Sequence, residues 1–149
     1  MNQRLIMHLH NRQREEIQSH GRTTYPEECC GFLFGTEINN ERVIHEVIPI
    51  DNSREDNKER RFLITPEDFI EAERRAQNLN LTLIGFYHSH PDHPAIPSEF
   101  DREHALPFYS YVIISVRNYQ PPEIRSYQLA DDRESYIEEK LIIHQRVAV

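Results

Sequence analysis

Residues 84–101 constrain the fold of this chain more than any other stretch. They read Ile-Gly-Phe-Tyr-His-Ser-His-Pro-Asp-His-Pro-Ala-Ile-Pro-Ser-Glu-Phe-Asp. The apolar run at the start predicts a buried strand, and it ends in His88 and His90. The loop that follows holds three prolines and cannot form a helix interior, while Ser98 opens a pattern typical of a helix start. Potential metal ligands therefore flank a stiff loop.

Size and charge bound what the chain can be. At 149 residues it is most simply one domain, residues 1–149, which buries roughly 70% of its unfolded surface. The formal net charge of -8 argues against nucleic acid or an anionic membrane as the main partner. No apolar run approaches the roughly 20 residues that span a bilayer, and the N-terminus has no secretory signal. We expect a cytoplasmic protein.

The two cysteines, Cys29 and Cys30, are adjacent. A disulfide between neighbours is strained, so we expect both to be buried thiols in a reducing compartment. Because thiolate is a strong zinc ligand, a cysteine-containing metal site stays open as an alternative.

The pattern of apolar and turn residues alternates between helices and strands. Helices are predicted over Asn11–Arg22, Thr65–Asn80 and Ser98–Leu106. Strands are predicted over Arg4–Leu9, Phe32–Phe34, Arg42–Ile50, Phe62–Ile64, Leu81–Tyr87, Tyr109–Val116 and Ile124–Leu129, and Tyr136–Ile143 is either a strand or a short helix. Interleaved elements in one domain predict an α/β or α+β class, with a mixed central sheet flanked by helices.

Three local details complete these predictions. Gly21 is interpreted as a helix stop signal, and Pro26-Glu27-Glu28 as a first helical turn, since proline suits its first position and acids suit its dipole. Asp51–Arg61 is almost wholly polar and is expected to be a surface loop.

The two histidines at the end of the apolar run predict a metal site. In a strand, residues i and i+2 point to the same side, so His88 and His90 converge. Catalytic zinc commonly takes three protein ligands, with nitrogen or carboxylate oxygen donors. Asp101 is the best third ligand, with His93 and His104 as rivals. On local grounds alone, a helix capping box formed by Ser98 and Asp101 is favoured over a metal ligand at Asp101.

These residues together resemble the motif of JAMM (MPN+/Mov34) zinc metallopeptidases. That motif is His-x-His, seven residues, Ser, two residues and Asp, with a Glu far upstream. Here His88 and His90 are followed by residues 91–97, then by Ser98, and after two more residues by Asp101. Glu28 stands three residues before a glycine that opens an apolar strand, which matches the upstream part. The resemblance covers about residues 5–130 and is closest to the compact stand-alone bacterial members.

The resemblance implies a fold and a set of roles. The fold is that of the MPN/JAMM domain, which resembles cytidine deaminase. His88, His90 and Asp101 would bind Zn²⁺ together with a water molecule. Glu28 would be the general base, and Ser98 would hydrogen-bond the oxyanion.

The resemblance also implies a substrate. We expect hydrolysis after the C-terminal Gly-Gly tail of a ubiquitin-like or sulfur-carrier protein, with residues 51–61 as the region that contacts it. One alternative is a zinc-bearing module that binds protein without hydrolysis. A zinc deaminase is the other, although its Pro-Cys-x-x-Cys ligand pair has no counterpart here.

Overall fold

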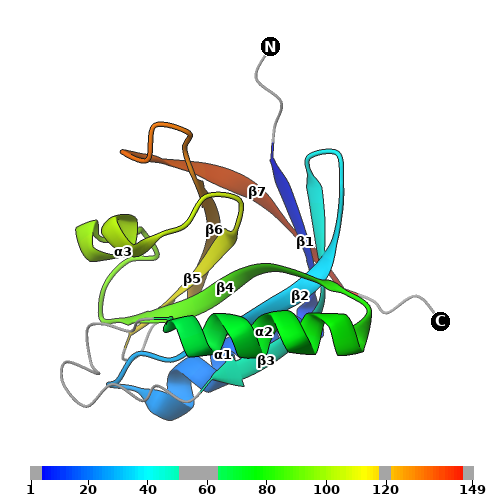
Figure 1. Cartoon of the computed structure of the whole chain (residues 1–149). Coiled ribbons are helices and arrows are strands. Elements are labelled where there is room, and N and C mark those ends of the chain that lie inside the picture. Colours follow the sequence, from blue (N-terminus) through cyan, green and yellow to red (C-terminus); the bar gives the residue numbers. More distant parts are fainter. Residues whose placement is uncertain (1–4, 51–63, 118–121, 146–149) are drawn as a thin grey trace.

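The computed structural model describes residues 5–50, 64–117 and 122–145 (Figure 1). The helices are α1 (Asn11–Thr24), α2 (Pro66–Leu79) and α3 (Glu99–His104). The strands are β1 (Ile6–His10), β2 (Cys30–Ile38), β3 (Glu41–Ile50), β4 (Thr82–Pro91), β5 (Ser110–Val116), β6 (Glu123–Leu129) and β7 (Tyr136–His144). None of the described helices is long and apolar enough to cross a membrane.

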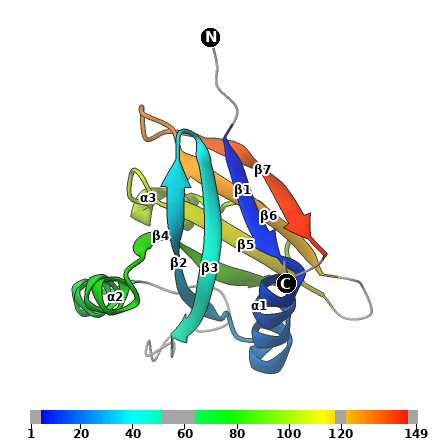
Figure 2. The ribbon, with the colours of Figure 1, turned by 90° about the vertical axis from the view of Figure 1, so that its right-hand side faces the viewer.

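All seven strands form one mixed sheet that closes on itself (Figure 2). Their order is β1-β3-β2-β4-β5-β6-β7. The pairs β1/β3, β1/β7 and β4/β5 are parallel, and the others are antiparallel. The predicted mixed sheet is confirmed. Closure follows from β7, the segment left open between strand and helix, because it pairs with both β6 and β1. The assignment of the chain to a single domain stays a prediction.

The helices α1 and α2 pack on opposite faces of the sheet (Figure 2). Successive side chains of β2 alternate between these faces, as expected for a strand buried on both sides. Leu33 joins a core with Ile17 of α1, whereas Phe32 and Phe34 join a second core with Ala72 of α2. The predicted helices are therefore confirmed as coverings of a central sheet.

Capping signals place α2 where the sequence predicts it. The side chain of Thr65 accepts a hydrogen bond from the Asp68 N–H, and Pro66 follows in the first helical turn. The helix ends at Asn80, which adopts a left-handed conformation and caps it. The preceding predicted strand, 62–64, lies mostly outside the described residues, and Ile64 is in no strand.

Two local predictions are wrong. Gly21 does not end α1, which runs on to Thr24. It is instead needed for close packing, because a Cβ atom there would come within 2.9 Å of Val116 Cγ2. Pro26 and the two glutamates after it form no helical turn. They link the end of α1 to the start of β2, so the acids serve no helix dipole.

Strand β4 carries the two motif histidines at its end. It lies between β2 and β5, as a central strand should, and all but its first residue is buried. The register pairs His88 with Cys30 of β2, and His90 with Ser115 of β5. His88 is thus paired with both neighbouring strands and His90 with β5, which fixes the positions of their main chains.

A buried carboxylate ties together β5, β6 and β7. Glu139 is 2% exposed and accepts hydrogen bonds from Ser110, Ser126 and Gln128. Ser110 in turn accepts a bond from the buried guanidinium of Arg42, at 2.8 Å. A buried carboxylate is tolerated only with such partners. The network therefore helps to hold the strands that close the barrel.

Replacing this carboxylate should destabilise the fold. Glu139→Ala leaves two buried donors, Ser110 and Ser126, and the half-buried Gln128 without their acceptor, so we expect a loss of roughly 3 kcal/mol in the free energy of unfolding, measured by urea denaturation. Glu138→Ala is the matched control, because Glu138 is the exposed neighbour and its loss should cost less than about 0.5 kcal/mol. Equal effects of the two changes would contradict the prediction.

Candidate metal centre

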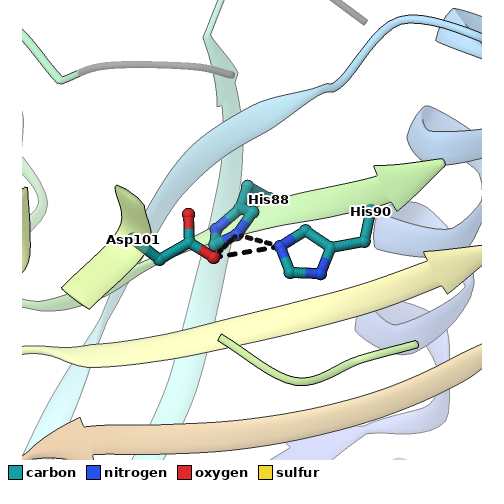
Figure 3. A group of neighbouring side chains, drawn as sticks. All are labelled: His88, His90 and Asp101. Carbon is teal, nitrogen blue, oxygen red and sulfur yellow. Dashed lines mark hydrogen bonds and ion pairs between the residues drawn. The ribbon is translucent and has the colours of Figure 1, made fainter. Parts of the chain in front are cut away.

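Three potential ligands converge from two elements (Figure 3). His88 and His90 extend from the end of β4, and Asp101 lies in the first turn of α3. One ligand atom of each lies within 4.8 Å of the others. Among the described residues this is the only group of three or more such side chains, and neither cysteine belongs to it. Both cysteines are buried thiols that form no disulfide, as predicted.

The three ligand atoms form a nearly regular triangle. His88 Nε2 lies 3.0 Å from His90 Nε2 and 3.3 Å from Asp101 Oδ2, and His90 Nε2 lies 3.0 Å from Asp101 Oδ2. Tetrahedral ligands at 2.0–2.1 Å from a zinc ion lie roughly 3.3 Å from one another. The triangle is therefore close in size to one face of a zinc coordination tetrahedron.

The loop after β4 decides which nitrogen of His90 faces this triangle. Nδ1 of His90 lies 3.0 Å from the carbonyl oxygen of Pro94, which can only accept a hydrogen bond. Nδ1 is therefore the protonated nitrogen of the neutral ring, and Nε2 directs a lone pair toward Asp101 Oδ2. Two such acceptors at 3.0 Å repel one another unless a cation or a proton lies between them. The donor set thus fits a divalent metal. Metal-binding histidines commonly donate their other ring N–H to a carbonyl or carboxylate, and the Pro94 carbonyl is that acceptor for His90.

Burial and neighbouring charges keep these groups ready to bind a cation. Burial lowers the pKa of the His88 imidazole below its usual range, against the opposing effect of the Asp101 carboxylate. Burial alone would raise the pKa of the Asp101 carboxyl, but the interaction with His88 and the hydrogen bond from the Ser98 N–H hold it well below its usual range. These shifts favour the neutral form of the His88 imidazole and the ionised form of the Asp101 carboxyl.

Ser98 caps α3 and also faces the open side of the site. The Ser98 N–H donates to Asp101 Oδ2 at 2.9 Å, and the Asp101 N–H donates to Ser98 Oγ at 3.0 Å. The capping box is therefore present, as one of the two interpretations of this sequence expected. Since Ser98 Oγ only accepts in this bond, its hydroxyl proton can donate to another group. Capping does not prevent a role in catalysis.

An open cleft of about 530 Å³ runs along one side of the ligand group. It brings Glu28 to the same surface as His90 and Ser98, although Glu28 is 60 or more residues earlier in the chain. Glu28 is 5% exposed, while its neighbour Glu27 is exposed to solvent. The structure thus distinguishes the two glutamates as the motif does.

A smaller cavity of about 50 Å³ lies on the His88 and Asp101 side. Its walls are largely apolar and aromatic, formed by Ile64, Phe69, His88, Phe100, Asp101, His104 and Tyr111. The two rival ligands are placed apart, since His104 lines this cavity and His93 lines the cleft. Neither belongs to the ligand group.

Sequence reasoning missed the groups that hold the loop in place. Ala95 is fully buried, its carbonyl accepts a bond from the Tyr127 hydroxyl at 2.7 Å, and Ser115 donates to the His93 carbonyl at 2.5 Å. With the Pro94 carbonyl these are main-chain acceptors, so no side-chain pattern marks them. The only available signal is the apolar pair Ala95-Ile96 between two prolines, and it does not indicate which of the two is buried. The predicted contact region 51–61 lies outside the described residues.

Comparison with known proteins identifies the family. A model described as prokaryotic homologs of the JAB domain matches residues 10–130, which include all five motif residues. The chain belongs to this family. The JAMM resemblance is thereby confirmed, and the deaminase interpretation is set aside.

Individual relatives support the same assignment. A desampylase from Haloferax volcanii is 32% identical over 107 residues, which cover 68% of this chain and 75% of the relative. A CysO-cysteine peptidase from Mycobacterium tuberculosis is 29% identical over 114 residues, which cover 76% of this chain and 75% of the relative. The solution structure of a protein from Desulfitobacterium hafniense superposes with a TM-score of 0.84 at 31% identity, over 95% of each chain.

The metal-free protein should lose stability as the pH falls from 7.5 to 5. The folded pKa of His88 is depressed, so below about pH 6.5 the unfolded chain takes up a proton that the folded chain does not. The stability is therefore complete above that pH and declines below it. The depressed pKa of Asp101 adds a further loss below about pH 4. The midpoint of urea unfolding at each pH measures both.

A pair of histidine variants isolates the contribution of His88. His88→Gln should reduce the pH dependence between 7.5 and 5. His104→Gln should leave it unchanged, because His104 is exposed and outside the ligand group. A wild-type midpoint that stays constant over this range would rule out the assigned neutral state of His88.

Proposed function

We propose that this protein is a zinc-dependent peptidase that hydrolyses the bond after the C-terminal Gly-Gly tail of a ubiquitin-like or sulfur-carrier protein. The observation that carries the proposal is the joint geometry of the site. Two imidazole nitrogens and one carboxylate oxygen converge beside an open cleft. The same cleft is lined by the buried Glu28 and by Ser98, which caps α3. Two relatives, a desampylase and a CysO-cysteine peptidase, support this class of substrate.

His88, His90 and Asp101 would hold the zinc ion. When bound, zinc polarises a carbonyl group and lowers the pKa of water to about 7. The ligand set of two neutral imidazoles and one carboxylate leaves the centre with a net positive charge. The depressed pKa of His88 helps here, because a neutral imidazole keeps its lone pair for the metal.

Glu28 would move the proton. From the wall of the cleft its carboxylate takes a proton from the attacking water and then delivers it to the leaving amine. Ser98, on the same cleft, donates its hydroxyl proton to the oxyanion that forms at the carbonyl carbon. This is the role left to it once Oγ has accepted the Asp101 N–H.

The position of Glu28 orients the substrate. The leaving amine must approach Glu28 to receive the proton, so the leaving group occupies the open cleft. The acyl side of the substrate then lies toward the small cavity beside His88 and Asp101. A space of about 50 Å³ with aromatic walls favours residues without side chains, which is the property of a Gly-Gly tail.

The purified protein should hold about one zinc ion per chain. Asp101→Ala should lose most of it, because the triangle then lacks its only charged ligand. Atomic emission analysis after dialysis measures the content, and Asp92→Ala serves as the control at an aspartate outside the ligand group. Equal zinc in both variants would exclude Asp101 as a ligand.

Glu28→Gln should abolish hydrolysis while keeping the metal. Losing the base should lower kcat by about 10²- to 10⁴-fold. The substrate is a carrier protein with a short peptide fused after its Gly-Gly tail, and mass spectrometry follows the cleaved product. Glu27→Gln is the matched control, since it removes the adjacent, exposed carboxylate and should leave kcat within twofold. Full activity in Glu28→Gln would remove Glu28 as the base.

A further inference from the structure

The proposed base lies just before β2, and the two histidine ligands lie on β4, which pairs with β2. Antiparallel β2 and β4 match Cys30 with His88. One step further, the Ser89 N–H donates to the Cys29 carbonyl at 3.1 Å, so the pairing continues beyond the start of β2. The next step brings Glu28 opposite His90, and both line the cleft. The position of the base thus depends on the neighbouring pair, Cys29 and Ser89.

In this pair, a side-chain hydroxyl takes the place of a main-chain carbonyl as the hydrogen-bond acceptor. The Cys29 N–H donates to the hydroxyl oxygen of Ser89, at 2.8 Å. Together with the Ser89 N–H bond to the Cys29 carbonyl, this makes a two-bond clamp between the residue after Glu28 and the residue between the two histidines. Ser89 is fully buried.

We propose that Ser89 is a positioning residue for Glu28: its hydroxyl, by holding the Cys29 N–H, keeps the glutamate in register with His90. The proposal rests on the function assigned above to Glu28. Ser89 itself touches neither substrate nor metal, because its side chain lies on the opposite face of β4 from the histidines.

The surroundings of Ser89 make the hydroxyl hard to replace. A Cβ atom built on Gly21 would lie 3.7 Å from Ser89 Cβ, so α1 packs directly over the serine. Water has little access to so enclosed a position. Without the hydroxyl, the Cys29 N–H would stay buried without an acceptor, which favours a shift of the segment that carries Glu28.

A second tie holds the other end of this segment. The Tyr25 hydroxyl donates to the Asp92 carboxylate, with oxygen distances of 2.7 and 2.8 Å. Tyr25 stands three residues before Glu28, and Asp92 two residues after His90. This bond lies at the surface, where water competes for both groups, so the buried clamp at Ser89 is the stronger constraint.

The test compares Ser89→Ala with Ser89→Thr in the full-length zinc-loaded protein. With the carrier fusion as substrate, Ser89→Ala should lower kcat roughly 10- to 100-fold and leave KM within about twofold, since a misplaced base slows chemistry but not binding. Zinc content should stay at the wild-type level. Ser89→Thr keeps a hydroxyl and should restore most of kcat.

Ser126→Ala is the matched control. Ser126 is also a fully buried serine that donates one hydrogen bond, to Glu139 in the network between β6 and β7. It should lose stability but keep kcat. A kcat of Ser89→Ala equal to that of Ser126→Ala would overturn the proposal, because the effect of Ser89 would then be on stability alone.

A readout without catalysis separates this proposal from the proposed function. In the metal-free protein, hydrogen exchange of the Cys29 amide should be at least tenfold faster in Ser89→Ala than in the wild type and unchanged in Ser126→Ala. Unchanged exchange in Ser89→Ala would overturn the clamp. If the wild type cleaves no carrier fusion, the proposed function fails, and the exchange result still decides whether Ser89 holds this segment.

Discussion

The site depends on one repulsion that the fold enforces. The lone pair of His90 Nε2 and the Asp101 carboxylate are held 3.0 Å apart, with the second imidazole at a similar distance. Both groups are held in place, because His90 is paired with β5 and Asp101 is hydrogen-bonded to the cap of α3. A cation or a proton between these atoms relieves the repulsion, and the fold brings the three ligand atoms together without the metal. Such preorganisation is what a Lewis-acid site needs.

The sheet brings the remaining group to this centre. Glu28 belongs to a segment between α1 and β2, and only the antiparallel pairing of β2 with β4 carries it to the cleft. The same strand that presents the histidines on one face presents Ser89 to the core on the other. Strand β4 therefore contributes to the site from both faces: His88 and His90 are ligands on one face, and Ser89 positions the segment of Glu28 from the other.

Local chemistry explains what could be predicted from the sequence. The caps of α2 and α3 depend on neighbouring residues, so Thr65 and Ser98 were identifiable, and the long motif spacing marked His88, His90 and Asp101. Features that depend on contacts between residues far apart in the sequence could not be predicted. Gly21 looks like a stop signal but exists for close packing against β5. The pair Glu27 and Glu28 suits a helix start, yet no helix follows, and the chain enters β2 at Cys30. Closure of the barrel required knowing that β7 meets β1, which no local pattern encodes.

The ring of His90 is oriented by a main-chain atom, the carbonyl of Pro94, and this has an evolutionary consequence. No single substitution can delete a carbonyl group, so the side chain at position 94 can drift as long as the chain keeps its path. Insertion or deletion of one residue between 91 and 97 would instead turn the Pro94 carbonyl away from His90 and displace Ala95 from its buried position. Natural variation should therefore be tolerated here in sequence but not in loop length.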